Sequence, residues 1–171
     1  MRIRFSFTLI ELIIVMAVIA LLAGLLLGVF SKARDRARMT GCASALKQIG
    51  TAINSYTVDY GDHLPVCERL NSVFGLPTLK EALKPYLSDL SIFGCPGDRA
   101  GHSPIYDSVG TSYEWNTFVN GLKIDRADFT IGDFNVVCPI LGDANASHCA
   151  RRNYLYSDGR TLEAMEVLIS K

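Results

Sequence analysis

The chain lacks an excess of charge of either sign. Its 171 residues include 17 Lys and Arg and 17 Asp and Glu, so the formal net charge is zero. A protein that binds nucleic acid through bulk charge carries a basic excess, so no nucleic-acid partner is predicted. Hydrophobic residues make up 49% of the chain, which argues against intrinsic disorder because disorder needs low hydrophobicity and high net charge.

Residue patterns that hold zinc or phosphate are also missing. The histidines His63, His102 and His148 stand singly, and neither a Cys-x-x-Cys pair nor a glycine-rich phosphate loop occurs. Structural zinc sites need closely spaced Cys and His ligands. We therefore expect neither a zinc site nor a phosphate-binding loop.

Two acidic groupings remain as candidate sites in the late part of the chain. A catalytic cluster would combine Asp143, His148 and Asp158, and a calcium site would combine Asp133, Asp143 and Asn145. Neither grouping has the spacing that its chemistry requires, and a turn already explains Asp158. We expect no enzyme activity and no cofactor, with calcium as the open alternative.

Proline is absent from the first 63 residues, and charge is absent from much of them. Residues 12–30 are nineteen consecutive residues without a charged side chain, most of them Leu, Ile, Val or Ala. A membrane-spanning helix needs about 20 predominantly apolar residues, so this stretch is long enough to span a bilayer. The sequence therefore predicts a transmembrane helix over residues 7–30.

The residues before this run do not fit an ordinary signal peptide. Such a peptide has an apolar region of about 7–15 residues that closes on small residues of the Ala-x-Ala type. Here the run is longer, and Glu11 lies at its beginning. A carboxylate in a membrane helix costs about 2.5 kcal/mol or more, so Glu11 predicts a functional role with a partner.

The hexamer Phe7-Thr8-Leu9-Ile10-Glu11-Leu12 follows a short basic leader and runs directly into the apolar helix. It resembles the class III signal of type IV pilins and type II secretion pseudopilins. The resemblance implies that a prepilin peptidase cuts between Ser6 and Phe7 and that the new amino terminus of Phe7 is methylated. Residues 1–6 would be the leader, and Glu11 would be the fifth residue of the mature chain. Ser6 stands where the family usually has Gly.

The expected role of Glu11 is in assembly. Apolar contact alone contributes little free energy to the association of helices in lipid, because the lipid tails are equally apolar. A carboxylate paired with the positive amino terminus of a neighbouring subunit would fix the axial register and offset the cost of both charges. The alternative is that Glu11 lies near the membrane interface and reaches toward water.

The helix is predicted to continue beyond the membrane as an amphipathic segment over residues 31–60. Apolar residues recur there in alternating steps of three and four, which places them on one helix face, and Gly61 follows as a stop signal. These residues are Met39, Cys42, Leu46, Ile49, Ile53, Tyr56 and Tyr60. We expect the chain's own C-terminal domain to cover this face, with a coiled-coil partner as the alternative.

Residues 61–171 are predicted to form a globular C-terminal domain. Three of its segments resemble pseudopilin-like proteins of planctomycete, verrucomicrobial and lentisphaeral type. They are residues 92–98 with their Phe-x-Cys-Pro-x-Asp pattern, residues 112–116, and residues 153–161. In that last segment Arg160-Thr161 replaces the His-Val of these proteins.

The domain is expected to contain an antiparallel sheet packed on the long helix. Strands are predicted over residues 112–115, 128–131 and 136–141, with a helix over residues 78–84. A closing hairpin would place Asp158-Gly159 in a two-residue type I′ turn. This combination gives an α+β fold of pilin type.

The five cysteines permit disulfides if the domain lies outside the cytoplasm. Cys42 lies on the helix stripe and is interpreted as a small core residue. The pairs Cys67–Cys95 and Cys138–Cys149 would each close a local loop, although connectivity does not follow from sequence.

The resemblance implies a structural subunit, assembled into a type II secretion pseudopilus or a type IV pilus-like filament. Its partners would be the prepilin peptidase, other pilin or pseudopilin subunits, the inner-membrane assembly platform and the lipid bilayer. It would cross the inner membrane once, with its C-terminal domain on the periplasmic side. The alternative is a monomeric membrane-anchored binding module that does not polymerise.

Overall fold

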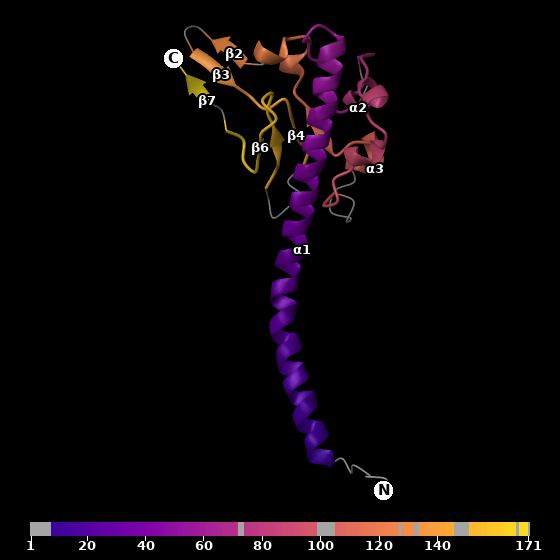
Figure 1. Ribbon diagram of the computed structural model, residues 1–171, viewed down its shortest axis with the longest axis vertical. Coiled ribbons are helices and arrows are strands. Elements are labelled where there is room, and N and C mark those ends of the chain that lie inside the picture. Colours follow the sequence, from indigo (N-terminus) through magenta and orange to yellow (C-terminus); the bar gives the residue numbers. More distant parts are fainter. Residues whose placement is uncertain are drawn as a thin grey trace. The chain divides into compact units, whose positions relative to one another are not determined.

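The computed structural model describes residues 8–71, 74–98, 105–126, 128–131, 134–145, 151–166 and 168–170. The chain forms two compact units, residues 1–36 and residues 37–171. Helix α1 (Leu9–Asp59) runs through both units (Figure 1). A single helix of these bounds confirms the one predicted from the sequence, because neither proline nor a turn signal interrupts it before Gly61.

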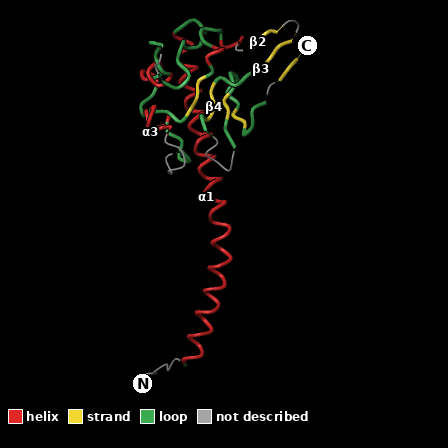
Figure 2. Tube along the Cα trace, turned by 180° about the vertical axis from the view of Figure 1, so that it is seen from behind, coloured by secondary structure: helices red, strands yellow, loops and turns green. Residues whose placement is uncertain are grey.

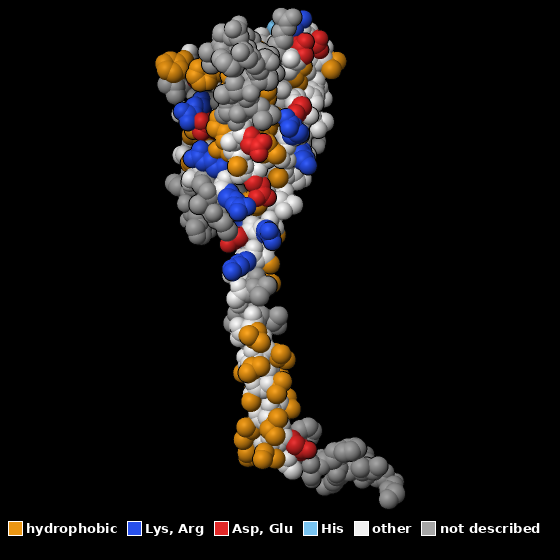
Figure 3. All heavy atoms as spheres, turned by 90° about the vertical axis from the view of Figure 1, so that its left-hand side faces the viewer, with side chains coloured by type: hydrophobic (Ala, Val, Ile, Leu, Met, Phe, Trp, Pro, Cys, Tyr) orange, Lys and Arg blue, Asp and Glu red, His pale blue; other side chains and the backbone are white. Residues whose placement is uncertain are grey.

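In the first unit α1 carries a series of exposed apolar side chains. Figure 3 shows these hydrophobic side chains along the N-terminal part of the helix. The exposed fraction is 76% for Leu9 and 69% for Leu25. An 18-residue window of the helix has a mean hydropathy of 3.1, so by length and composition it could cross a membrane.

In the second unit one face of α1 forms part of the hydrophobic core. Cys42, Leu46, Ile49 and Ile53 are fully buried, among residues of the C-terminal domain. The predicted stripe is thus covered by the chain's own domain. It ends earlier than predicted, because Tyr60 is 57% exposed and stacks on Tyr56 with ring centroids 4.1 Å apart.

The turn after α1 depends on two left-handed residues. Gly61 and Asp62 have φ angles of 63° and 66°, and the Asp62 N–H donates to the Thr57 carbonyl at 2.8 Å. Such a residue at the end of a helix satisfies carbonyls that would otherwise lack partners. The predicted stop at Gly61 is confirmed.

The two short α-helices that follow lie on one side of α1 in the second unit, whereas the labelled strands β2, β3, β6 and β7 lie on the other side (Figures 1 and 2). Helix α2 (Leu79–Ala82) begins at a capping box between Thr78 and Glu81, and helix α3 spans Ile105–Val109. Four 3₁₀ turns complete these connections: Lys84–Tyr86, Leu90–Phe93, Thr117–Val119 and Ile124–Arg126. The predicted helix over residues 78–84 is confirmed in position and shorter than expected.

Two antiparallel sheets make up the β part of the domain. The four-stranded sheet has the order β1-β4-β5-β6, and the three-stranded sheet has the order β2-β3-β7. The strands are β1 (Tyr113–Trp115), β2 (Asp128–Ile131), β3 (Phe134–Val137), β4 (Leu141–Asp143), β5 (Tyr154–Leu155), β6 (Thr161–Leu162) and β7 (Leu168–Ser170). The α+β pilin-like layout expected from the sequence is therefore observed.

The predicted strand over residues 136–141 is divided between β3 and β4, which belong to different sheets. Pro139 lies at the break, and its carbonyl accepts a hydrogen bond from the Asn116 amide at 2.9 Å. Proline has no N–H to donate to a ladder, so a continuous strand is disfavoured at this point.

The closing hairpin also differs from its predicted turn. Gly159 is left-handed with φ 82°, whereas Asp158 is not among the residues of positive φ in the described chain. The Tyr156 N–H donates to the Arg160 carbonyl at 3.0 Å. The hairpin therefore has a three-residue loop with a left-handed glycine, not the predicted type I′ turn, which requires positive φ at both central residues.

The disulfide joins Cys42 to Cys95, with the Cα atoms 5.2 Å apart. The predicted Cys67–Cys95 pairing is wrong, and Cys67 is a buried free thiol. Locality in sequence misled the prediction, because the buried face of α1 brings Cys42 to Cys95. Cys149 lies outside the described residues, so the Cys138–Cys149 pairing stays a prediction.

Candidate functional site

Thr8 and Glu11 form a reciprocal hydrogen-bonded pair at the start of α1. The Thr8 N–H and hydroxyl both donate to Glu11 Oε2, at 2.9 and 2.6 Å, and the Glu11 N–H donates to Thr8 Oγ1 at 3.3 Å. This capping box satisfies N–H groups that have no partner within the helix. Its Thr-x-x-Glu spacing is visible in the sequence, yet the prediction considered for Glu11 a contact between subunits or a place near the membrane interface, and not this cap.

The capping box uses one carboxylate oxygen of Glu11. Within the described part of the chain, Oε1 of this exposed side chain makes no hydrogen bond. A negative group at the N-terminus of a helix also interacts favourably with the helix dipole. The geometry thus fixes the orientation of Glu11 and leaves one oxygen available to a positive group outside the chain.

The predicted cleavage residues Ser6 and Phe7 lie outside the described residues. The helix that follows them is exposed along its apolar length, which is unfavourable in water. Lipid is the solvent in which such a surface is stable. The N-terminal helix fits a membrane anchor.

In the C-terminal domain, Asp143 is 3% exposed at the end of β4. Its Oδ2 accepts from the Asn153 N–H at 2.7 Å and from the Asn153 side-chain amide at 3.0 Å. Burial raises the pKa of Asp143 to about 6, while the bonds from Asn153 and the charge of Arg152 oppose the shift. The nearby charge of Asp98 raises this pKa further.

Asp98 lies in the same buried region and is also 3% exposed. Its Oδ2 accepts from the Ser112 hydroxyl at 2.7 Å and from the Tyr106 N–H at 3.1 Å. The other oxygen of Asp98 and that of Asp143 are buried without a hydrogen-bond partner in the described structure. The Asp98 carboxylate therefore ties the Phe-x-Cys-Pro-x-Asp segment to the residues that lead into β1.

The other candidate acids are Asp133 and Asp158. Asp158 is exposed in its turn, where its carboxylate accepts from the Arg160 N–H at 2.9 Å. Asp133 and His148 lie outside the described residues. Over the described ranges, His, Cys, Asp and Glu form no group of three that could hold a metal ion.

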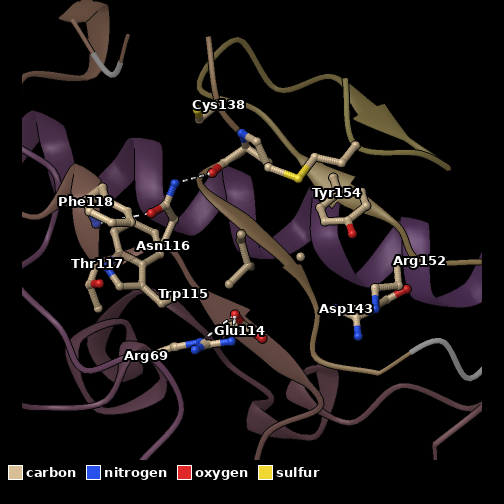
Figure 4. Close-up of a pocket in the computed structure, with 14 residues that line it drawn as sticks. Arg69, Glu114, Trp115, Asn116, Thr117, Phe118, Cys138, Asp143, Arg152 and Tyr154 are labelled. Atoms are coloured by element: carbon tan, nitrogen blue, oxygen red, sulfur yellow. Dashed lines mark hydrogen bonds and ion pairs between the residues drawn. The ribbon is translucent and has the colours of Figure 1, made fainter. Parts of the chain in front are cut away.

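A pocket of about 410 Å³ opens on the four-stranded sheet. Figure 4 shows Trp115 and Phe118 toward one side of it and Tyr154 toward the other. Arg69 and Glu114 form an ion pair at its edge, 2.5 Å apart. The full lining is Arg69, Glu114, Trp115, Asn116, Thr117, Phe118, Cys138, Pro139, Leu141, Gly142, Asp143, Arg152, Tyr154 and Met165.

The hollow depends on a glycine in the central strand. Glu114, Gly142 and Tyr154 are directly opposite one another across β1, β4 and β5. A Cβ on Gly142 would lie 2.7 Å from the Tyr154 ring. The missing side chain therefore allows the ring to lie over the strand. This row could not be predicted from the sequence, because its members are spread over 41 residues.

Comparison with known proteins gives a family match at the N-terminus of the chain. Residues 1–27 match the family described as the prokaryotic N-terminal methylation motif. Neither a curated protein nor a solved structure matches the chain. The match covers the segment in which the capped Glu11 leads into the exposed apolar helix, so the chain carries the prepilin signal of type IV pilins and pseudopilins.

Proposed function

We propose that this chain is a structural, non-enzymatic subunit of pilin or pseudopilin type that works without a cofactor. It is cut between Ser6 and Phe7, methylated on Phe7, and held in the inner membrane by a single helix. It then assembles into a type II secretion pseudopilus or a type IV pilus-like filament. The observation that supports this proposal most is the methylation motif running directly into an exposed apolar helix.

The proposed assembly step depends on Glu11. Cleavage would leave a positive amino group on Phe7, directly before the capping residue Thr8. Both that group and a carboxylate are costly in hydrocarbon, and pairing them offsets the cost. The Phe7 amino group of a neighbouring subunit would reach Glu11 Oε1, while Oε2 holds the capping box within its own chain.

Repetition of this contact would build the filament. The amino terminus of one subunit and the Glu11 of another are different surfaces, so the contact is heterologous and does not close. Each added subunit would bury its apolar helix against other helices, with the C-terminal domain on the periplasmic side. The partners are then the prepilin peptidase, further subunits and the inner-membrane assembly platform.

The test compares Glu11→Gln with Glu81→Gln in cells that contain the peptidase and the assembly machinery. Glu81 is a matched control because it closes a second Thr-x-x-Glu capping box, with Thr78, in the C-terminal domain. Intact mass and N-terminal sequence of the membrane fraction should show wild type and both variants starting at methylated Phe7. The Glu11→Gln chain should be absent from sheared filaments, whereas Glu81→Gln should be incorporated like wild type.

Other outcomes would refute parts of the proposal. A chain that starts beyond the apolar helix would mean an ordinary signal peptide. A chain that still starts at Met1 would mean that the motif is not processed. If Glu11→Gln is processed and incorporated like wild type, the register contact is wrong, and an anchored monomeric binding module, which the pocket on the sheet favours, becomes the better description.

A further inference from the structure

We propose that the pocket on the four-stranded sheet binds an organic carboxylate with an apolar body. The apolar body would lie over Gly142 between Phe118 and Tyr154, and the carboxylate would pair with Arg152. This inference concerns the isolated subunit and goes beyond its assembly. Four properties of the pocket support it. The pocket opens on the face of the sheet away from α1, and its walls are apolar and exposed. The backbone N–H groups around it are already hydrogen-bonded, and Arg152 offers a cation that is unpaired in the described chain.

The pocket opens on the face of the sheet that α1 does not cover. Leu155 packs against α1, since its side chain lies within 3.2 Å of the Cβ position of Gly50. Successive side chains of a strand point to opposite faces, so Tyr154 points away from the helix. With Gly142 between Tyr154 and Glu114, this outer face is hollow instead of flat.

The walls of the hollow are apolar and largely uncovered. Phe118 is 79% exposed and Met165 is 54% exposed, and both line the pocket together with Tyr154. Concave sites of about 300–1,000 Å³ with apolar walls are typical of small-ligand binding. Burying these side chains against an apolar body would stabilise a complex by removing them from water.

The two arginines that line the pocket differ in whether their guanidinium group is already paired. The Arg69 guanidinium is already paired with Glu114. Arg152 is exposed, and in the described chain it forms no hydrogen bond or ion pair, although its charge acts on Asp143. A guanidinium presents planar paired donors that fit a carboxylate, so Arg152 selects an anion of this shape.

The backbone around the pocket excludes main-chain recognition of an added strand. The Trp115 N–H donates to the Arg69 carbonyl, and the Asn116 N–H to the Ile140 carbonyl. The Asp143 N–H donates to the Asn153 carbonyl. Since strand addition needs free backbone groups at an edge, a ligand here is bound through its body and its charge.

A carboxylate beside an apolar group occurs in two sources, a free organic acid and the C-terminal residue of a polypeptide. The probes are therefore 3-phenylpropionate and the peptide Gly-Gly-Phe with a free carboxylate. Their matched neutral controls are 3-phenylpropionamide and the same peptide as its amide. Binding to the unassembled full chain in phosphatidylcholine nanodiscs is followed by the fluorescence of Trp115, the chain's one tryptophan, which lines the pocket.

Two variants, each with a matched control, test the two parts of the site. Arg152→Gln removes the cation, and Arg151→Gln removes an adjacent exposed arginine whose partner, Glu163, lies outside the pocket. Phe118→Ala removes an apolar wall, and Phe74→Ala removes a phenylalanine that is 87% exposed and does not line the pocket. All four side chains are exposed, so each variant should fold.

We expect at least one carboxylate to bind about 10-fold tighter than its amide, because a charge-assisted hydrogen bond contributes roughly that factor. Arg152→Gln should abolish this preference, Phe118→Ala should weaken acid and amide alike, and both controls should behave as wild type. If only the free acid binds, the source is a small molecule, and if only the peptide binds, the source is a polypeptide terminus.

Equal affinity for acid and amide would overturn the proposal, and so would a preference that survives Arg152→Gln. Failure of both acids to bind with a Kd below about 1 mM would overturn it as well. Because the test uses unassembled subunits, none of these results bears on processing or filament assembly.

Discussion

At the residue scale, Asp143 makes the stability of the C-terminal domain depend on pH. Its pKa is raised from 3.8 to about 6, chiefly by burial. A carboxyl group with a raised pKa in the fold binds its proton more tightly when folded than when unfolded. The contribution of Asp143 to the free energy of unfolding is therefore largest below about pH 4 and falls as the pH rises to about 6.

The first prediction concerns Asp143→Asn. The amide oxygen can still accept from Asn153, but it carries no charge, so the variant should lose most of this pH dependence. A shift of about two units corresponds to a loss of roughly 3 kcal/mol in the wild type between pH 4 and pH 7. Urea unfolding across this range, followed by Trp115 fluorescence, measures the difference.

The control for that experiment is Asp158→Asn, since Asp158 is exposed in its turn. This variant should keep the wild-type slope of stability against pH. If Asp143→Asn keeps the same slope as well, the burial of Asp143 does not control the titration.

Asn120 is a second residue on which the domain depends. Its Oδ1 accepts from the Trp115 indole N–H at 2.7 Å and from the Cys67 N–H at 3.1 Å. Its Nδ2 donates to the Cys67 carbonyl at 3.0 Å. One amide thus holds the loop after α1 and satisfies the donor of a tryptophan that is 1% exposed.

We predict that Asn120→Ala lowers the free energy of unfolding by about 2–4 kcal/mol, because it leaves buried donors and an acceptor without partners. Chemical denaturation measures this loss. Asn54→Ala, at an exposed position on α1, should change stability by no more than about 0.5 kcal/mol. A loss for Asn120→Ala as small as that of Asn54→Ala would contradict the assigned role.

Sequence reasoning works at this scale only where the partners are close along the chain. The Thr8–Glu11 capping box joins residues three positions apart and could have been predicted from its spacing. Asn120 and Cys67 are 53 residues apart, and neither residue has a pattern that names the other. Their contact needs the fold to be known first.

At the element scale, the disulfide between Cys42 and Cys95 anchors α1 to the segment before α3. It closes a loop with a sequence separation of 53 residues. Closing a loop of this length restricts the unfolded chain and stabilises the fold by about 4 kcal/mol in the chain-entropy description. Disulfides persist in oxidising compartments, as the proposed placement of this domain outside the cytoplasm would require.

We predict that Cys42→Ser, Cys95→Ser and the double variant each lose about 4 kcal/mol of stability. The double variant should be no less stable than the single variants, because all three lack the same bond. Denaturation of oxidised protein measures this comparison. Additive losses would show that the two sulfurs contribute separately and that the bond is not formed.

Helices and strands could be predicted from the sequence where residues close along the chain determine them. The helix and its stripe followed from periodicity over about six turns, and the structure confirms the helix and the stripe up to its exposed end at Tyr60. The prediction of one strand over residues 136–141 was wrong, because the apolar run on which it rested continues through Pro139, where the chain passes from one sheet to the other. Composition shows a preference for strand, but the choice between two sheets depends on partners far along the chain.

At the scale of the whole molecule, the sequence of the first unit indicates a function, whereas the sequence of the second unit indicates mainly a fold. The first unit carries a short motif tied to one processing reaction, and the family match over residues 1–27 agrees with it. The second unit has a fold that could be outlined from strand and turn patterns. Its pocket could not be outlined, since the row of Glu114, Gly142 and Tyr154 is assembled only by strand register.

The processing prediction can be tested at Ser6. We expect Ser6→Gly to speed cleavage, since glycine is the residue usual before the cut in the pilin family. Timed sampling of precursor and mature chain by gel mobility, with the peptidase present, measures the rate. Lys32→Gln, on the other side of the apolar helix, should leave the rate unchanged, and a slower cut in Ser6→Gly would contradict the assigned cleavage position.

The bond between Cys42 and Cys95 also determines how the subunit carries a load. Without the bond, a pull along α1 would be resisted by the packing of its buried face in the core, and the covalent path into the domain would run through the turn at the far end of the helix. With the bond in place, tension passes from the helix to the Cys95 segment through a covalent link. Reduction of the Cys42–Cys95 bond would therefore lower the force at which the buried face of α1 separates from the domain.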